Sequence, residues 1–472
     1  MVFSGMSFLF FFLPTLLAVY YLIPMRLRNA RNSVLLVFSL FFYAFGGPRF
    51  LLLMLISIAI NYACGLFAAP EHSQKMRKLA VATASVLGLG LLGWFKYSGF
   101  LVETINMLGT SIPVPEITLP IGISFFTFQG LSYVVDVYRG DTGVQRNPLK
   151  IALYISLFPQ LIAGPIVRYK TIENAIDMRH ETFDEFAGGA TRFVFGLSKK
   201  MLLANALGEI ADKLFTGDPG ALSVTAAWIG AIAYTGQIYF DFSAYSDMAL
   251  GLGRMFGFRF LENFNYPYIS KSISEFWRRW HISLSTWFRD YLYIPLGGNR
   301  VSRAKHIRNI VIVWLLTGLW HGAAWNFVVW GAWVCILLLC EAFVWGKHLE
   351  KAPSVYRHIY ALALIIITRV FFRSDTVIGA FQYIGAMFGS SGVTVDGRGV
   401  FYLIQYWPEL ILAVIASMPV KNYVAGFLEK RTDAFSTILY AWGPKALALA
   451  LLALSYMKLV TGSFNPFIYF RF

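Results

Sequence analysis

One histidine stands in the middle of a long segment that carries no charge. Between Arg308 and Glu341 the chain has no Asp, Glu, Lys or Arg, and His321 lies near the centre of that segment. A bilayer is crossed by roughly 20 apolar residues, so the segment is long enough to span one. An ionisable side chain at that depth is costly, and burial favours its neutral form. A neutral imidazole can take a proton from a hydroxyl, so we predict a general base at His321. A structural histidine bonded to a neighbouring helix is the alternative.

A second histidine lies in a segment rich in aromatic and arginine residues. Lys271–Arg300 is too charged to span a membrane and is typical of a helix at the interface, with rings at head-group depth and guanidinium groups on phosphates. Anchoring does not explain His281, which stands 40 residues before His321. That separation allows the chain to return, so both imidazoles could face one cavity. Three arginines of the segment could contact lipid phosphates: Arg278, Arg279 and Arg289.

Two acidic residues interrupt another apolar segment, QIYFDFSAYSD. Asp241 shares a helical face with Ala244 and Tyr245, and Asp247 shares one with Ser243. The two carboxylates could orient an imidazole or pair with the arginines of the interfacial segment. Structural ion pairing is an equally good interpretation.

Proline and glycine break two further apolar segments. Pro120, Gly122 and Gly130 interrupt Leu119–Tyr138, and Phe158–Tyr169 has the same character. Irregular backbone at membrane depth survives only inside protein or along a cavity, so we expect re-entrant elements. Polar residues that would line them include Ser124, Thr127, Gln129, Ser132 and Gln160.

The composition indicates a membrane protein. Hydrophobic residues make up 57% of the 472 residues and charged residues 14%, and the mean hydropathy is +0.59. Soluble domains of this length do not have such values. The net charge of +15 is spread over loops, which suits anionic lipid and excludes a basic nucleic-acid-binding domain. The three cysteines have no zinc spacing and indicate no disulfide framework, and we predict no metal site.

The apolar segments predict ten to twelve spans, some of them short. Met6–Ile23 has no positive segment before it and no cleavage site, so we expect a retained first span with an extracytoplasmic N-terminus. Arg26, Arg28 and Arg31 would then lie in the cytoplasm. The expected spans are Met6–Ile23, Ser33–Phe45, Phe50–Ala69, Leu79–Phe95, Ile151–Val167, Ala227–Met248, Ile310–Cys340 with a break at Gly322, Tyr360–Val370, Tyr402–Val420 and Ala446–Val460.

One glycine pattern imitates a known motif. Gly251, Gly253 and Gly257 form GxGxxxG, which is not the dinucleotide fingerprint, and no alternation of strands and helices surrounds it. We interpret it as close helix packing or a turn near a helix end. The HExxH and GxSxG motifs are absent, so neither a zinc protease nor an α/β-hydrolase is supported.

Five segments taken together resemble the membrane-bound O-acyltransferase superfamily. The resemblance is strongest to its bacterial branch, which includes the membrane subunit for alginate O-acetylation, peptidoglycan and cellulose acetylation relatives, and the D-alanyl transfer protein of teichoic acids. It covers nearly the whole chain. The segments, in order, are LPIGISFFTFQGLSYVVDVYRG, FPQLIAGPIVRY, YFDFSAYSDMALGLGRMFG, FWRRWHISLSTWFRDYLYIPLGGNR and GLWHGAAWNFVVWG.

The resemblance implies an all-α, polytopic transmembrane protein that encloses a tunnel. It makes His321 the catalytic histidine and His281 the second functional position. We expect one membrane domain over 1–472, with peripheral N-terminal helices at 1–95, a catalytic core at 119–375 and C-terminal scaffold helices at 400–472. The residues expected to line the tunnel or contact substrate are Trp320, Asn326, Gln129, Gln160, Asp241, Ser243, Asp247 and Trp280.

The resemblance also implies acyl transfer, with an acetyl group as the expected cargo. The donor would be acetyl-CoA or another cytoplasmic acyl thioester, with no bound cofactor, and its phosphates could be steered by Arg278, Arg279 and Arg289. The acceptor would be a hydroxyl of an extracytoplasmic polysaccharide such as alginate. We expect the bacterial cytoplasmic membrane as the location. A separate extracytoplasmic hydrolase-like partner is expected because this chain has no recognisable Ser-His-Asp trio. The alternatives are a transporter or flippase for an acyl or lipid-linked intermediate, which the embedded ionisable residues would also suit, and a non-catalytic scaffold of an export complex.

Overall fold

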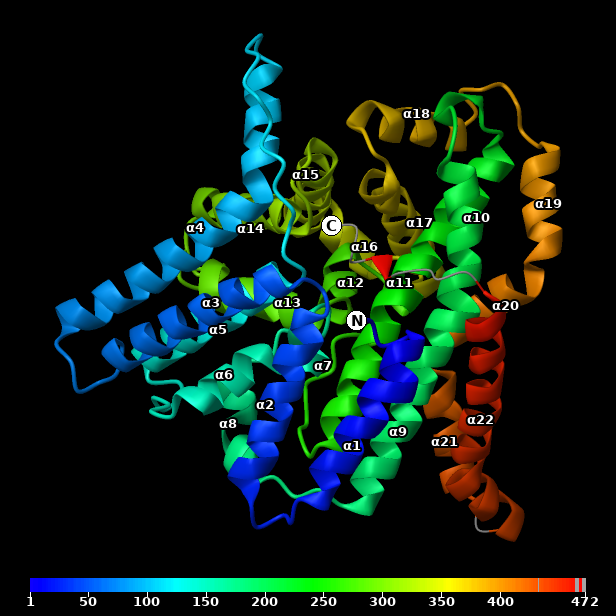
Figure 1. The fold of residues 1–472 in the computed structure, drawn as a ribbon. Coiled ribbons are helices and arrows are strands. Elements are labelled where there is room, and N and C mark those ends of the chain that lie inside the picture. The colour runs from blue at the N-terminus through cyan, green and yellow to red at the C-terminus, as the bar shows by residue number, and fades with distance from the viewer. Residues whose placement is uncertain (432, 463–466, 469–472) are drawn as a thin grey trace. The chain divides into compact units, whose positions relative to one another are not determined.

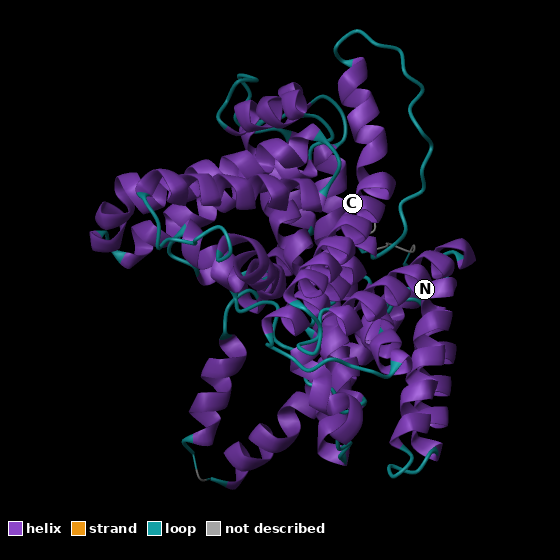
Figure 2. Cartoon of the chain, turned by 90° about the vertical axis from the view of Figure 1, so that its left-hand side faces the viewer, coloured by secondary structure: helices purple, strands orange, loops and turns teal. Residues whose placement is uncertain are grey.

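The protein consists of helices and loops. The computed structural model describes all residues except 432, 463–466 and 469–472, and the described residues include no strand (Figure 2). Several of the helices are long and apolar enough to cross a membrane. The predicted fold class, an all-α polytopic membrane protein, is confirmed.

The chain divides into two compact units, and the division falls within two of its helices, α9 and α11. The first unit comprises residues 1–193 and 245–261. Its elements, in blue through cyan to green in Figure 1, are η1 (Phe8–Phe12), α1 (Leu13–Leu22), α2 (Arg28–Ala44), α3 (Pro48–Phe67), α4 (Gln74–Asn106), α5 (Ile123–Arg139), α6 (Pro148–Ser156), α7 (Phe158–Leu161), α8 (Tyr169–Met178), the first part of α9 (Phe183–Ser198) and the end of α11 (Val224–Met255).

The second unit comprises residues 194–244 and 262–472, and it contains both histidines singled out above. Besides its parts of α9 and α11, its elements are η2 (Lys199–Ala204), α10 (Asn205–Phe215), η3 (Pro219–Ala221), η4 (Pro267–Ile269), α12 (Ile273–Arg279), α13 (Ile282–Phe288), η5 (Arg289–Tyr293), α14 (Arg303–His321), α15 (Trp325–Cys340), η6 (Glu341–Trp345), α16 (Gly346–Lys351), α17 (Ser354–Arg373), α18 (Val377–Met387), α19 (Gly397–Gln405), α20 (Trp407–Ala416), α21 (Val420–Glu429) and α22 (Ala434–Thr461).

Fewer helices meet the length and hydropathy of a span than the sequence predicted. Among the described residues five do so, or six if the bent pair α19 and α20 forms one span. Some expected spans are divided into shorter helices. Ile151–Val167, for example, is split at Leu157 between α6 and α7, because Pro159 favours a new helical start. The five are Pro48–Phe67, Gln74–Asn106, Trp325–Lys351, Ser354–Arg373 and Ala434–Thr461.

Two of the predicted breaks are present and one is wrong. The chain breaks at Gly322, directly after α14. It also breaks at Gly122, whose φ of 77° lies in the left-handed region that favours glycine. Gly130, by contrast, lies inside the continuous helix α5. A Cβ atom there would come within 2.4 Å of the Asn61 side chain, so this glycine serves the close approach of α3 rather than a break.

The interpretation of the GxGxxxG pattern as helix packing is confirmed. A Cβ atom on Gly251 would lie 2.6 Å from the carbonyl oxygen of Gly189 in α9. A Cβ atom on Gly253 would lie 2.4 Å from the Phe260 ring. Gly257 follows the end of α11 with a φ of 80°, which is the left-handed turn that ends many helices.

Candidate active site

A tight helical hairpin positions His321. Helices α14 and α15 meet where Gly318 faces Gly331, and a Cβ atom on either would lie about 2.5 Å from a backbone oxygen of the other helix. The absence of these side chains lets the two backbones approach closely. His321 is the last residue of α14, and the extended Gly322 turns the chain toward α15.

His321 is buried among aromatic rings. Its ring centroid lies 4.9 Å from Trp330, 5.0 Å from Trp320 and 5.4 Å from Phe372. Its Nδ1 is 2.7 Å from the carbonyl oxygen of Thr317, one turn earlier in α14. A carbonyl oxygen only accepts, so Nδ1 carries the proton of the neutral ring. The lone pair is therefore on Nε2, the atom that a general base uses.

His281 is held in an unusual backbone conformation before α13. Its φ of 46° is in the left-handed region, which is uncommon for a residue other than glycine and clusters at functional sites. Its Nδ1 is 3.2 Å from Oδ1 of Asn263. That oxygen also accepts from the backbone N–H and the hydroxyl of Ser283, which identifies it as the acceptor end of the amide. His281 is therefore also protonated on Nδ1, and its Nε2 has no hydrogen-bond partner among the described residues.

Both histidines pack against one indole. The Trp320 ring is 5.9 Å from His281 and 5.0 Å from His321, centroid to centroid. Burial lowers the pKa of His281, and the nearby His321 lowers it further. The structure therefore brings together two residues that are 40 positions apart in the sequence, in a surrounding that keeps His281 neutral.

A buried arginine that the sequence analysis missed contacts the same site. The guanidinium of Arg369 lies 4.2 Å from the centre of the Trp280 ring, directly before His281. Arg369 is 2% exposed. It belongs to α17, and Phe372, three residues later on that helix, packs on His321. Helix α17 thus contacts the surroundings of both histidines. A cation between apolar residues, in ITRVFF, was the signal that could have identified it.

Helix α11 contributes one aromatic neighbour of His281 and one buried ion pair to the second unit. Phe242 packs edge-on against His281 at 4.7 Å, and Ser243 follows it as a buried residue. Asp241 pairs with Lys200 at 2.6 Å, and both are 2% exposed. The backbone N–H of Ile468 also donates to Asp241. Asp241 therefore makes a structural ion pair with Lys200, which the sequence analysis did not single out.

Two polar residues tie the elements of the site together. Asn326, at the start of α15, donates to the carbonyl oxygens of Phe371 and Ser374 at the end of α17. Glu341, which ends the charge-free segment, accepts from the backbone N–H groups of Ile273 and Ser274 and so caps α12. Asn326 was predicted at the site, whereas the role of Glu341 was missed because its partners are distant in sequence.

Of the remaining predicted residues, the three arginines belong to the second unit, and Asp247, Gln129 and Gln160 belong to the first. Arg279 pairs with Glu275 and Arg289 with Asp290, both locally in sequence, and Arg278 is exposed. Asp247 pairs with Arg192 in the first unit. Gln129 and Gln160 are fully buried in that unit. Their relation to the histidine pair stays a prediction, as do the phosphate-binding roles of the three arginines.

Comparisons with known proteins find relatives over the whole length of this chain. The model of the membrane-bound O-acyltransferase family matches residues 142–372, a range that includes both histidines. A probable alginate O-acetylase of Azotobacter vinelandii is 42% identical, with all of both chains covered. A peptidoglycan O-acetyltransferase of Helicobacter pylori is 31% identical over all of this chain and 98% of the relative. A teichoic acid D-alanyltransferase of Bacillus subtilis is 29% identical over 52% of this chain and 65% of the relative.

Proposed function

Because this chain belongs to the membrane-bound O-acyltransferase family, we propose that it moves an acetyl group from a thioester donor to a hydroxyl, with His321 as general base. The chain is a multi-pass membrane protein and an O-acetyltransferase by its relatives. The base, the donor and the direction of transfer are our proposal.

The tautomers of the two histidines are the observation that carries this proposal. Nε2 of His321 takes the proton of the acceptor hydroxyl as its oxygen forms a bond to the thioester carbon. The C–S bond then breaks, and the imidazolium returns the proton to the leaving thiolate. A positioned base contributes ~10²–10⁴-fold to such a step. His281, which packs against the same Trp320 ring, orients the reacting carbonyl or shares the proton.

We propose acetyl-CoA as the donor and the cytoplasm as its source. The basic residues Arg26, Arg28 and Arg31 follow the first apolar segment, which supports a cytoplasmic position for that loop and an extracytoplasmic N-terminus. The location that fits is the bacterial cytoplasmic membrane. The chain itself would need no bound cofactor, because the thioester brings the activated acetyl group.

The acceptor we propose is an extracytoplasmic polysaccharide, and the relatives favour alginate. The chain has no Ser-His-Asp trio in its sequence for completing transfer onto a polymer. We therefore propose a separate extracytoplasmic hydrolase-like partner that takes the acetyl group onward.

The test is acetyl transfer from radiolabelled acetyl-CoA by membranes that contain wild type, His321→Ala or His358→Ala at matched expression. His358 is a matched control, because it also bonds a carbonyl oxygen through Nδ1, that of Ser270 at 3.2 Å. We expect His321→Ala to lose transfer by ~10²-fold or more and His358→Ala to retain it. Unchanged transfer by folded His321→Ala protein would make His321 a structural histidine and favour the transporter alternative.

A further inference from the structure

A cationic pocket lies in the first unit, and none of the residues that line it was predicted as a site residue. Its volume is about 320 Å³. The residues come from α9, from the end of α11 and from the segment that follows it. They are Glu185, Arg192, Leu250, Arg254, Phe258, Arg259 and Phe260.

The packing of α9 against α11 builds this pocket. The two helices touch at Gly189 and Gly251, where a Cβ atom on either would lie 2.6 Å from the backbone oxygen of the other. Glu185 pairs with Arg254 at 2.5 Å on one side of this contact, and Arg192 pairs with Asp247 at 2.8 Å on the other. The glycines therefore bring the two helices close together, and the ion pairs hold the arginines that line the pocket.

Arg259 adds a third guanidinium from the segment after α11. It pairs with Glu185 at 2.7 Å, and its side chain is 82% exposed. One carboxylate, Glu185, thus serves both Arg254 and Arg259. Phe258 and Phe260, both buried, supply apolar wall.

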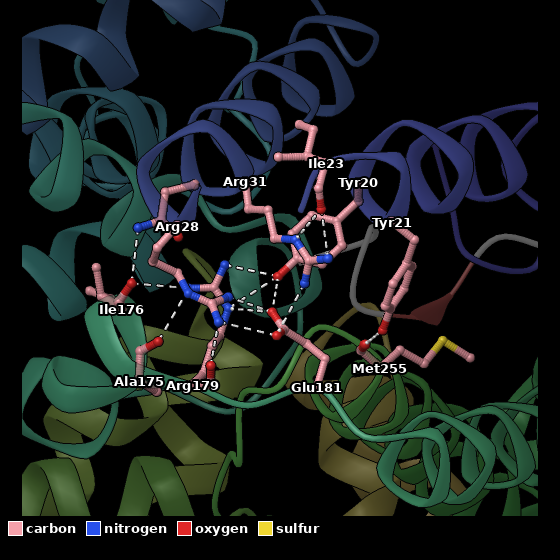
Figure 3. A network of polar contacts seen from close by, with 11 residues as sticks. Tyr20, Tyr21, Ile23, Arg28, Arg31, Ala175, Ile176, Arg179, Glu181 and Met255 are labelled. Atoms are coloured by element: carbon pink, nitrogen blue, oxygen red, sulfur yellow. Dashed lines mark hydrogen bonds and ion pairs between the residues drawn. The ribbon is translucent and has the colours of Figure 1, made fainter. Parts of the chain in front are cut away.

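A second arginine cluster adjoins the pocket through Phe258. The guanidinium of Arg179 lies 4.4 Å from the centre of the Phe258 ring. Figure 3 shows that Arg179 belongs to a network in which Arg28 and Arg31 also converge on Glu181. Glu181 is 1% exposed, so this single carboxylate is buried among three guanidinium groups.

The summed charge of this region is positive. Six arginines in the pocket and the adjoining network face three carboxylates, those of Glu181, Glu185 and Asp247. Positive charge in a concave surface with low-dielectric walls attracts anions. Guanidinium groups bind phosphate in a planar, two-pronged geometry that a lysine cannot supply.

We propose that this pocket binds a phosphate ester or diphosphate group through Arg254 and Arg259. Two sources supply that chemistry at a cytoplasmic membrane surface, the diphosphate of a CoA-type donor and the head group of an anionic lipid. Arg28 belongs to the loop and helix start that the positive charge assigns to the cytoplasm, where both are present. That the bound phosphate belongs to the acetyl donor rests on the proposed function, whereas the binding of phosphate by this pocket does not.

The test measures binding rather than catalysis. Full-length wild type and Arg259→Gln are placed in phosphatidylcholine nanodiscs and titrated with CoA, with pantetheine, which lacks phosphate, and with inorganic pyrophosphate. A second set of nanodiscs contains phosphatidylglycerol, and the amount of this lipid that the protein retains is measured. Arg259→Lys keeps the positive charge but loses the planar, two-pronged hydrogen bonding of the guanidinium group. Arg398→Gln is the matched control, since Arg398 is 57% exposed and pairs with Asp396 at 3.0 Å in the other unit.

We expect Arg259→Gln to weaken CoA and pyrophosphate binding about tenfold, which corresponds to about 1.4 kcal/mol. The affinity of Arg259→Lys for CoA and pyrophosphate should lie between those of wild type and Arg259→Gln. Arg398→Gln should bind as wild type does. Pantetheine binding should not change. Loss of phosphatidylglycerol retention with unchanged CoA binding would support the pocket and identify lipid as its source.

Equal binding of CoA, pyrophosphate and phosphatidylglycerol by wild type and Arg259→Gln would overturn the proposal. A wild-type protein that binds none of these three molecules would also overturn it. Anion binding that persists in a wild-type protein without acetyl transfer would instead count against the proposed function alone.

Discussion

The imidazole of His281 lies 5.9 Å from the indole of Trp320, the residue directly before His321. The neighbours of this pair come from separate elements: Asn263 precedes η4, Phe242 belongs to α11, and Phe372 belongs to α17. Because these contacts join elements far apart in sequence, the site depends on the packing of the whole second unit. A change at any of these neighbours therefore tests whether the orientation of the histidines matters for transfer.

Asn263→Ala should lower both kcat and the stability of the protein. The change removes the acceptor of His281 Nδ1–H and of the Ser283 N–H, both in a buried place. A buried donor without a partner costs about 1–3 kcal/mol, and a comparable loss in the transition state lowers kcat by roughly 10–100-fold. The measurement is kcat and the thermal unfolding midpoint of detergent-purified protein. An unchanged kcat would show that the His281 tautomer has no part in transfer.

Asn263→Asp separates orientation from charge at the same position. A carboxylate accepts the same hydrogen bonds but favours the imidazolium, so it should raise the pKa of His281, which burial and His321 now hold low. If neutral His281 is the active form, the acid limb of the rate profile moves to higher pH. A profile that overlays that of wild type would contradict an active neutral His281.

Arg369→Met should reduce activity while the protein stays folded. Methionine has a similar length and suits the aromatic surroundings, so the cost of losing a buried cation is small. The contact with Trp280 is lost, however, and such cation–π contacts contribute about 0.5–2 kcal/mol. We expect kcat to fall about tenfold at an unchanged unfolding midpoint, with partial recovery in Arg369→Lys. A fall of the midpoint together with kcat would point to a packing role.

The sequence predicted features that follow from short patterns. Gly322 ends a helix because the Trp-His-Gly segment breaks an otherwise apolar run, and Gly251 allows close packing because it has no side chain. Gly130 also interrupts an apolar run, but it lies inside the continuous helix α5. Its missing side chain makes room for Asn61 of α3. A glycine next to a distant partner cannot be distinguished from a breaking glycine by local pattern alone.

Buried charges were harder to predict than the histidines. His321 stands alone in a charge-free segment, which isolates it at once. Lys200 follows another lysine and resembles the end of a loop, yet it pairs with Asp241 in a buried position. Arg369 and Glu341 lie at or near the ends of apolar runs, where lysines and arginines ordinarily reach the interface. Their partners come from other helices, and only tertiary structure reveals them.

Glu341→Gln should destabilise the second unit. The carboxylate accepts from two backbone N–H groups at the start of α12, at 2.6 and 2.9 Å, and from the Ser274 hydroxyl at 2.7 Å. Hydrogen bonds to a charged group contribute about 1.5–3 kcal/mol, and the neutral amide keeps only one accepting oxygen. We expect a lower unfolding midpoint. Glu275→Gln, in α12 itself, removes a half-exposed pair with Arg279 and should cost about 1 kcal/mol or less. Equal midpoints for the two variants would rule out the capping role.

Acid should weaken the first unit through Glu181, and Arg28→Gln should make that loss smaller and complete at a higher pH. Burial alone raises the pKa of Glu181, but hydrogen bonds from Arg28 and Tyr20 and the charges of Arg28 and Arg179 lower it overall, below 4.5. Its stabilisation is therefore complete above 4.5 and is lost as the pH falls through the folded-state value. Without Arg28, which binds Glu181 at 2.5 Å, the folded-state pKa rises toward the unfolded value. The loss then still begins near pH 4.5 but ends at a higher pH and is smaller.

The unfolding midpoint as a function of pH checks this expectation. At neutral pH Arg28→Gln should already cost about 1–3 kcal/mol, because two guanidinium groups still hold the carboxylate. Arg146→Gln is the control, since its pair with Glu71 is solvent-exposed on both sides and screened by water. The control should follow the wild-type curve at every pH. If Arg28→Gln follows it as well, Glu181 is held by Arg31, Arg179 and Tyr20 alone, and the role assigned to Arg28 is wrong.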